Sequence, residues 1–380
     1  MSSSDTSCNS NLARRGFLKC LGATAVLPLA RDLKFFQAVQ DTASSAPVLR
    51  LPQPIGSPVL DSLPPVIKAS RHVRTNVDRI VEVASWMAYE ELPLPEFALP
   101  FGLGAGDQDQ TIDFLMVADT IDFAFTDFSS NVKFQVDYAG EHWSDSNAMF
   151  ACLKRGLDEG RPLLDGNYLQ RIRKADLEQI FRGNIEMPML EERVAIFHEV
   201  GSVLQNRYNG RFHNFVKSAS PRLYDDGRGL VEKLVSEFPR FRDVSTYNGH
   251  EIKLYKLAQL SLWMMYSALR PSGTFRLDDA EKMSAFADYI VPAALRVMGI
   301  ISYSPRLENA IQTHQIIGRD SQEEIEIRAH TLYATALLRE EINRLRPPEM
   351  HIIIPQVDAR LWTHYHTTFW PHHLTRTIMY

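Results

Sequence analysis

Apolar residues recur at helical spacing through most of the chain between about residue 165 and residue 345. The clearest stretch begins at Ser321, where Glu324 follows at the position that completes a capping box. The apolar residues that share one face of this predicted helix are Ile325, Ala329, Leu332, Ala336 and Leu337. We expect the helix to end near Arg344, and the pattern indicates a mainly α-helical protein.

Two further helices are predicted around a proline. Asp278 is placed to cap a helix over residues 279–286. Pro292 fits the first turn of the next helix, which we expect to end near Val297, because proline is tolerated there and disrupts a helix at later positions. Asp288 would then lie between the two helices.

The N-terminal half of the predicted domain has a mixed pattern. A helix is predicted over residues 73–86, and residues 91–112 are rich in proline, glycine and acidic residues, which is typical of a loop. Residues 120–125 and 132–138 alternate around a polar turn, which predicts a β-hairpin. A helix is expected to follow over residues 148–157.

The composition fits one large domain. The chain has 380 residues, of which 45% are hydrophobic and 23% are charged. We therefore expect a single mainly α domain over residues 60–380, with one small antiparallel β element near residues 113–138. The net charge is −5, whereas proteins that hold long nucleic acids by their phosphates carry a basic face. We expect a small anionic ligand as the partner, and no long nucleic acid.

The N-terminal residues 1–55 are rich in Ser, Ala, Thr and Pro and are typical of a disordered tail. Arg14-Arg15 precedes a short apolar stretch from Cys20 to Ala30, which fits a twin-arginine export signal; a chance match in a disordered tail, or a transit peptide, is the alternative. Because no run of about 18 apolar residues occurs, we expect neither a transmembrane helix nor a membrane partner.

The three cysteines, Cys8, Cys20 and Cys152, form no CxxC pair. Two of them lie in the tail. We therefore expect neither a disulfide framework nor a cysteine zinc site.

Three peptides in the last third of the chain carry the candidate chemistry. In chain order they are Tyr255-Lys256-Leu257-Ala258-Gln259, Phe286-Ala287-Asp288-Tyr289 with Pro292, and Val357-Asp358-Ala359-Arg360-Leu361-Trp362. Taken singly, each has an ordinary explanation: Lys256 as a solvated lysine, Asp288 as a helix cap and Asp358 as a loop carboxylate. In this order, the peptides resemble those of the queuosine salvage protein family.

The resemblance covers roughly residues 60–380 and implies an α-helical fold related to the DNA glycosylases of the helix-hairpin-helix kind. It also implies hydrolysis of the N-glycosidic bond of queuosine 5′-monophosphate, which frees queuine without a metal or an organic cofactor. Salvage of a tRNA-derived nucleotide is expected inside the cell. The resemblance therefore favours a cytoplasmic protein, with export through the twin-arginine-like signal as the alternative.

The resemblance assigns roles to four residues of the second and third peptides. Phe286 and Trp362 would clamp the flat base, and Asp288 would accept hydrogen bonds from its polar edge or its side-chain amine. Asp358 would stabilise the cation that develops on the ribose, attack it, or activate water. The roles of Asp288 and Asp358 could also be exchanged.

Three other residues complete the expected site. His72 lies in a segment that resembles one of the family, in which a histidine meets the base. Lys256 would hold the anionic part of the nucleotide, and Arg376, near the chain's end, could bind its 5′-phosphate. The ordinary alternative for His72 is a structural histidine.

One position departs from the family pattern. The family carries an acidic residue directly after Leu-Trp, whereas this chain has Thr363. A catalytically impaired protein that binds the nucleotide or queuine without cutting is therefore the alternative function, unless another group such as His364 replaces the acid. The C-terminal histidines, His364, His366, His372 and His373, lack a carboxylate partner at a recognised spacing, so no metal site is expected.

Overall fold

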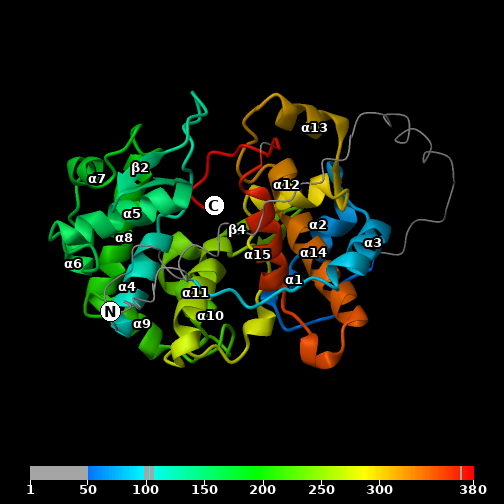
Figure 1. Cartoon of the computed structure of the whole chain (residues 1–380), viewed down its shortest axis with the longest axis horizontal. Helices are drawn as coiled ribbons and strands as arrows, with labels where there is room; N and C mark the ends of the chain where they lie inside the picture. The colour runs from blue at the N-terminus through cyan, green and yellow to red at the C-terminus, as the bar shows by residue number, and fades with distance from the viewer. Residues whose placement is uncertain (1–49, 98–101, 103–106, 369) are drawn as a thin grey trace, which may run out of the picture. The chain divides into compact units, whose positions relative to one another are not determined.

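The computed structural model describes residues 50–97, 102, 107–368 and 370–380. These residues belong to one compact unit, Arg50–Tyr380, in which helices are the main secondary structure (Figure 1). The mainly α fold class is therefore confirmed. The expected twin-arginine signal, Cys8 and Cys20 lie outside the described residues.

The helices of this unit vary from one turn to 24 residues. The α-helices are α1 (Pro58–Asp61), α2 (Pro64–Ala69), α3 (Val77–Met87), α4 (Gln108–Asp119), α5 (Asp145–Asp158), α6 (Gly166–Leu169), α7 (Lys174–Ile180), α8 (Leu190–Arg207), α9 (Phe212–Ser218), α10 (Leu230–Glu237), α11 (Lys256–Leu269), α12 (Ile290–Val297), α13 (Pro305–Gln312), α14 (Gln322–Leu345) and α15 (Ile354–Tyr365). Short 3-10 helices are η2 (Pro239–Phe241), η3 (Arg270–Ser272), η4 (Ala280–Lys282) and η5 (Pro348–Met350).

The β-structure consists of three two-stranded antiparallel sheets among the described residues. They pair β1 (Val73–Thr75) with β6 (Ile301–Tyr303), β2 (Gln135–Tyr138) with β3 (Glu141–Ser144), and β4 (Val244–Tyr247) with β5 (His250–Lys253). The prediction of one β element near residues 113–138 was therefore too narrow. The strands β4, β5 and β6 also interrupt the stretch that was expected to be helical throughout.

Two helix predictions are confirmed in the C-terminal half. The helix α14 begins after Ser321, whose hydroxyl accepts a hydrogen bond from the Glu324 N–H at 3.2 Å. The helix α12 carries Pro292 within its first turn and ends at Val297, as expected. In the N-terminal half, helix α3 begins only after the strand β1, because Asn76 caps it by accepting from the Arg79 N–H.

The predicted hairpin between residues 120–125 and 132–138 is reduced to one isolated antiparallel bridge, between Thr126 and Lys133, beside which the Phe134 N–H donates to the Phe125 carbonyl at 2.7 Å. Residues 120–125 follow α4 as an irregular segment, and β2 pairs with β3 instead. The cause is long-range: the buried guanidinium of Arg193 donates hydrogen bonds to the carbonyls of Ile121, Phe123 and Ala124. A strand partner is therefore not needed to satisfy these carbonyls. The two aromatic residues of this segment, Phe123 and Phe125, line a cavity that is described below.

Two other segments differ from the pattern. Helix α4 begins at Gln108, inside the predicted loop; its residues from Ile112 to Asp119 are all buried, so they show no amphipathic period. Residues 279–286 form only the short turn η4 instead of a helix. Asp279 there accepts hydrogen bonds from the Leu223 and Tyr224 N–H groups, which fixes the segment against another part of the chain.

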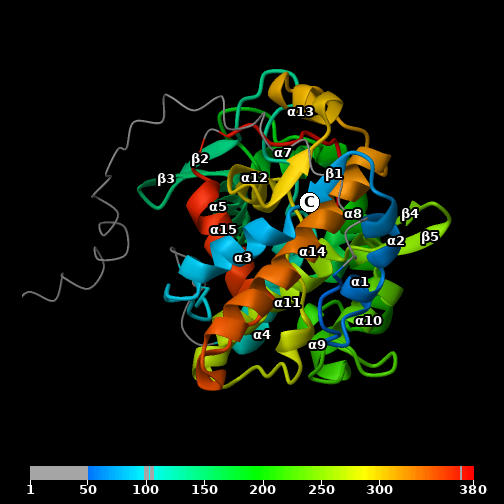
Figure 2. The ribbon, with the colours of Figure 1, turned by 90° about the vertical axis from the view of Figure 1, so that its right-hand side faces the viewer.

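The packing places two helices at the centre of the described unit. Helix α11 packs against α4 and α10, and α15 packs against α12 and α14. In Figure 1, α4 to α9 lie on the left, α10 lies beside α11, and α2, α3, α13 and α14 lie to the right of α15. Figure 2 shows α3 beside the long helix α14, with which it packs. The segments that meet near α11 and α15 form the candidate site.

Candidate functional site

A cavity of about 410 Å³ opens where residues of α11, α15 and the segments before α5 and α12 approach one another. Its volume is in the range of small-molecule sites. Among the residues that line it are Phe97, Asp122, Phe125, Lys256, Phe286, Asp288, Tyr289, Asp358, Trp362 and Tyr380. Aromatic rings and carboxyl groups thus face the same space.

Helix α15 presents one face to this cavity. Asp358 and Trp362 are one turn apart, and His366 follows one turn later, just after the helix ends. The Trp362 indole stacks on the His366 imidazole, with 4.2 Å between ring centroids and 5° between planes. Thr363 lies on the same face and is exposed, so it belongs to the outer part of the cavity.

The three peptides singled out in the sequence are joined by hydrogen bonds. The side-chain amide of Gln259 in α11 donates to the Ser284 hydroxyl at 2.9 Å and accepts from the Ser284 N–H at 2.9 Å. This fixes the segment that carries Phe286. The Phe286 N–H in turn donates to Asp358 Oδ2 at 2.8 Å. These hydrogen bonds hold the peptides that contain Gln259 and Phe286 against α15, which carries Asp358.

Asp288 is both a helix cap and a cavity residue. Its Oδ1 accepts hydrogen bonds from the Ile290 and Val291 N–H groups of α12, at 2.8 and 3.1 Å. The side chain is nevertheless 8% exposed and faces the cavity. Burial raises the pKa of Asp288, while Lys256 and the two N–H donors oppose that rise.

Asp358 is more strongly perturbed. Burial raises the pKa of its carboxyl well above the ordinary value, and the negative charge of Asp288 raises it further. The Phe286 N–H and the Lys256 ammonium oppose the shift without cancelling it. These surroundings favour the protonated form of Asp358.

Lys256 is the first residue of α11 and is 6% exposed. Its backbone N–H donates to Asp243 Oδ2 at 3.2 Å, and its Nζ lies 3.8 Å from Asp122 Oδ2. The preceding residue, Tyr255, has a φ of 44°, a left-handed conformation that turns the chain abruptly into the helix. These contacts direct the ammonium into the cavity wall.

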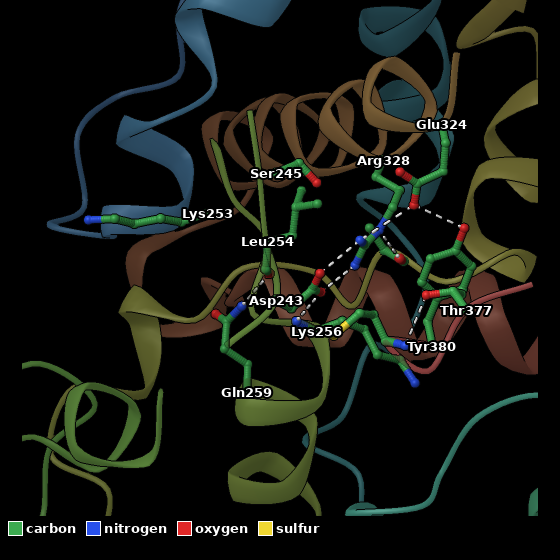
Figure 3. Close-up of polar contacts among 12 residues, drawn as sticks. Asp243, Ser245, Lys253, Leu254, Lys256, Gln259, Glu324, Arg328, Thr377 and Tyr380 are labelled. Carbon is green, nitrogen blue, oxygen red and sulfur yellow. Dashed lines mark hydrogen bonds and ion pairs between the residues drawn. The ribbon is translucent and has the colours of Figure 1, made fainter. Parts of the chain in front are cut away.

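A buried network behind Lys256 reaches the end of the chain (Figure 3). Asp243 forms two hydrogen bonds with the Arg328 guanidinium, at 3.0 and 2.5 Å. Arg328 also lies 3.6 Å from Glu324 Oε1, and its guanidinium carbon lies 4.6 Å from the centre of the Tyr380 ring. The Tyr380 hydroxyl donates to Glu324 Oε1 at 3.1 Å. The last residue is thereby held as part of the cavity wall.

Two residues expected in the site do not line the cavity. His72 contacts the Ser304 hydroxyl at 3.3 Å and Glu323 at 3.9 Å, near the start of α13. Arg376 forms an ion pair with Glu192, and its side chain is 55% exposed. The structure therefore brings together five of the expected residues, which are Lys256, Phe286, Asp288, Asp358 and Trp362.

The C-terminal histidines have separate surroundings. His364 is exposed and lies 3.0 Å from the Arg360 carbonyl, outside the cavity lining. His372 stacks on Tyr289, and His373 contacts the Tyr380 hydroxyl at 3.1 Å. Within the described part of the chain, no group of three or more His, Cys, Asp or Glu side chains is arranged to hold a metal ion.

Sequence reasoning missed several residues of the site. Tyr380 and Tyr289 carry no pattern that marks them. Arg193 and Arg240 both contact Phe123, with guanidinium carbons 4.3 and 5.1 Å from its ring centre. Of these residues, only His366 could have been predicted from the sequence. It lies eight residues after Asp358 and four after Trp362, a helical spacing that places the three on one face.

Comparisons with known proteins cover the part of the chain that contains the three peptides. The profile of the family described as "Queuosine salvage protein" matches residues 104–380. The chain belongs to this family. A relative from Sphaerobacter thermophilus is 33% identical over 326 residues, which are 85% of this chain and 97% of the relative. The family predicted from the three peptides is thus confirmed.

More distant relatives of the queuosine salvage family come from eukaryotes. One from Bos taurus is 29% identical over 62% of this chain and 68% of its own length. One from Schizosaccharomyces pombe is 27% identical over 72% of this chain and 83% of its own length. All three relatives carry the name "Queuosine 5'-phosphate N-glycosylase/hydrolase". No described helix of this family member combines the length and apolar character needed to cross a bilayer.

Proposed function

We propose that this chain hydrolyses the N-glycosidic bond of queuosine 5′-monophosphate and releases queuine for salvage into tRNA modification. One observation carries the proposal. Asp288 and Asp358 meet Phe286 and Trp362 in one cavity, in a chain whose relatives bear the name of that enzyme. The combination offers flat surfaces for a base beside carboxyl groups for the sugar.

Cleavage of the N-glycosidic bond needs two catalytic contributions. As the C–N bond breaks, positive charge develops on the ribose, and a carboxylate beside it lowers the barrier. The departing base leaves more readily when an acid gives it a proton. A pair of carboxyl groups with different pKa values can supply both functions at neutral pH.

The contacts support one of the two role assignments that the sequence left open. Asp288 accepts two N–H hydrogen bonds at the start of α12, which favour its ionised form. Asp358 accepts one, and it lies close enough to Asp288 for that charge to raise its pKa. We therefore assign the carboxylate that stabilises the ribosyl cation to Asp288 and the proton donor to Asp358. Water then attacks C1′ of the ribose and gives up a proton that restores the Asp358 acid, and ribose 5-phosphate is the second product.

Phe286 and Trp362 are proposed to hold the base. Phe286 is 5% exposed and lies two residues from Asp288, so a base against its ring would lie beside the carboxyl pair. One face of Trp362 is covered by His366, which leaves the other face for stacking. The relation of this fold to helix-hairpin-helix glycosylases and the cytoplasmic location stay predictions.

The test is to incubate the purified protein with queuosine 5′-monophosphate and to follow free queuine by mass spectrometry. Asp358→Asn keeps an oxygen that can accept from the Phe286 N–H but cannot donate the proton as an acid, so turnover should fall by roughly 10²-fold or more while the nucleotide still binds. Unchanged turnover in this variant would remove Asp358 from the mechanism.

A second function is favoured by one observation. Thr363 lies at the exposed part of the cavity where the family pattern has an acidic residue. If that acid is required for cutting, the chain would bind the nucleotide without hydrolysis. Binding of queuosine 5′-monophosphate with no queuine released by the wild-type protein would establish this alternative.

A further inference from the structure

The ammonium of Lys256 lies among carboxyl groups from several elements. Asp122 faces it from the segment after α4, and the two side chains are only 10% and 7% exposed. Its positive charge also lowers the pKa values of Asp119 in α4, of Asp288 before α12 and of Asp358 in α15. One buried cation thus acts on four carboxyl groups.

Because carboxyl groups surround the Lys256 ammonium, a phosphate would be only weakly attracted to it. A 5′-phosphate carries up to two negative charges and would have to lie beside Asp122 and Asp288 to reach the ammonium. The buried Arg193 and Arg240 already donate to backbone carbonyls of residues 120–124. Among the described lining residues, the other lysine is Lys133, whose side chain is 51% exposed and pairs with Asp145.

We propose that the buried Lys256–Asp122 ion pair, which shares the cavity wall with Asp288 and Asp358, consists of positioning residues for that carboxyl pair, and that the nucleotide's phosphate binds out of their reach. This inference rests on the proposed function, because it concerns the same carboxyl pair. It replaces the expectation that Lys256 holds the anionic part of the nucleotide. The Lys256 ammonium and the Asp122 carboxylate act on the reaction only through the two carboxyl groups.

The other titratable groups that face Asp288 do not compete with this pair. Tyr289 and His372 are both buried near it, and burial raises the pKa of the phenol and lowers that of the imidazole, so both are uncharged at neutral pH. Burial likewise raises the pKa of Asp119 well above the ordinary value, which favours its uncharged form. Lys256 thus acts on both carboxyl groups and Asp122 acts on Asp288, while the buried Arg193 and Arg240 carry further positive charge beside Asp122.

The inference predicts opposite effects for the two partners. Turnover needs Asp288 ionised and Asp358 protonated, so kcat/KM should rise with the ionisation of Asp288 and fall with that of Asp358. Lys256→Met removes a positive charge and raises both pKa values, so both limbs of the pH profile should move to higher pH. Asp122→Asn removes a negative charge and should move the acid limb to lower pH.

A double variant protects the test against misfolding. Lys256→Met alone takes from the buried Asp122 the ammonium beside it, which could destabilise the fold. Lys256→Met combined with Asp122→Asn removes both charges of the pair, so the acid limb should return toward the wild-type position while the limb set by Asp358 stays at higher pH. Lys256→Arg keeps the positive charge, and its limbs should stay near the wild-type positions.

Two readouts decide the inference. The ratio of kcat/KM for the nucleotide to that for the nucleoside should be unchanged in Lys256→Met; a fall of roughly tenfold or more would show that Lys256 binds the phosphate and would overturn the inference. Carboxyl carbon NMR titration of Asp288 and Asp358 in wild type and variants measures the same shifts without turnover. Titrations of Asp288 and Asp358 that do not shift in the variants would also overturn the inference. A wild-type protein that releases no queuine would instead contradict only the proposed function.

Discussion

Asp119 shows at the residue scale how strongly this protein perturbs its acids. The side chain is fully buried at the end of α4, and neither carboxyl oxygen has a hydrogen-bond partner among the described residues. Burial raises its pKa well above the ordinary value, and the negative charge of Asp122 raises it further. A protonated acid under the cavity wall avoids the large cost of an unpaired buried charge.

The titration of Asp119 should make folding stability depend on pH. Because the pKa is raised in the folded state, the stabilising contribution is complete below the unfolded value of about 3.8 and is lost as pH rises toward the folded value. The free energy of unfolding of the wild type should therefore fall between about pH 5 and about pH 8, by up to about 1.4 kcal/mol per pH unit. In Asp119→Asn, which cannot ionise, the fall should be smaller.

Urea unfolding at the two pH values measures this difference. Asp226→Asn is the control, because Asp226 is exposed and its left-handed φ of 49° is readily adopted by asparagine. The control should retain the wild-type pH dependence. An Asp119→Asn variant with the full wild-type fall would show that another group is responsible.

At the scale of elements, local patterns predicted what local interactions determine. Helix α14 has a cap at Ser321, and α12 tolerates Pro292 in its first turn, so both could be found from the sequence. The course of residues 120–125 could not, because it depends on Arg193, about seventy residues later in the chain. Residues 279–286 likewise take their shape from hydrogen bonds between Asp279 and a distant segment.

The residues of the candidate site also fall into those that the sequence could identify and those that depend on the fold. Lys256, Phe286 and Asp358 could be named because each lies in a peptide that resembles the family. That Asp122 pairs with Lys256 depends on how the chain folds back over α11, which no local pattern reports. The final residue, Tyr380, enters the wall only through Glu324 and Arg328 of α14.

Helix α15 offers a direct test of the departure at Thr363. If Asp288 and Asp358 suffice for the chemistry, Thr363→Asp should change kcat by less than roughly tenfold, because the residue lies at the exposed part of the cavity. Steady-state kinetics with Thr363→Asn as a control of equal size separates charge from shape. A gain of roughly tenfold or more in the aspartate variant alone would identify Thr363 as the cause of impaired activity.

The contact between α14 and the start of α11 should be important for stability. Arg328→Met would leave Asp243 and Glu324 buried without their cation, and it should cost roughly 3–5 kcal/mol in the free energy of unfolding. Arg306→Met is the matched control, since the Arg306 side chain is 83% exposed and its ion pair should contribute about 1 kcal/mol or less. Equal urea midpoints for the two variants would contradict the role of the network in Figure 3.

For the whole molecule, the charge argues against a nucleic-acid partner. With a net charge of −5, the chain lacks the basic excess that releases counterions from a polyanion. We expect no complex with tRNA at about 0.1 M salt in a native gel. A retarded band that weakens steeply with added salt would indicate a basic surface and a macromolecular partner.

The central claim is that one cavity, built from three distant peptides, cuts the glycosidic bond of a modified mononucleotide. The most direct measurement follows free queuine from queuosine 5′-monophosphate by mass spectrometry, with the wild type beside Asp358→Asn and Asp288→Asn. We expect steady release by the wild type and a large loss in both variants, while each still binds the nucleotide. Wild-type binding without queuine, or full activity in both variants, would contradict it.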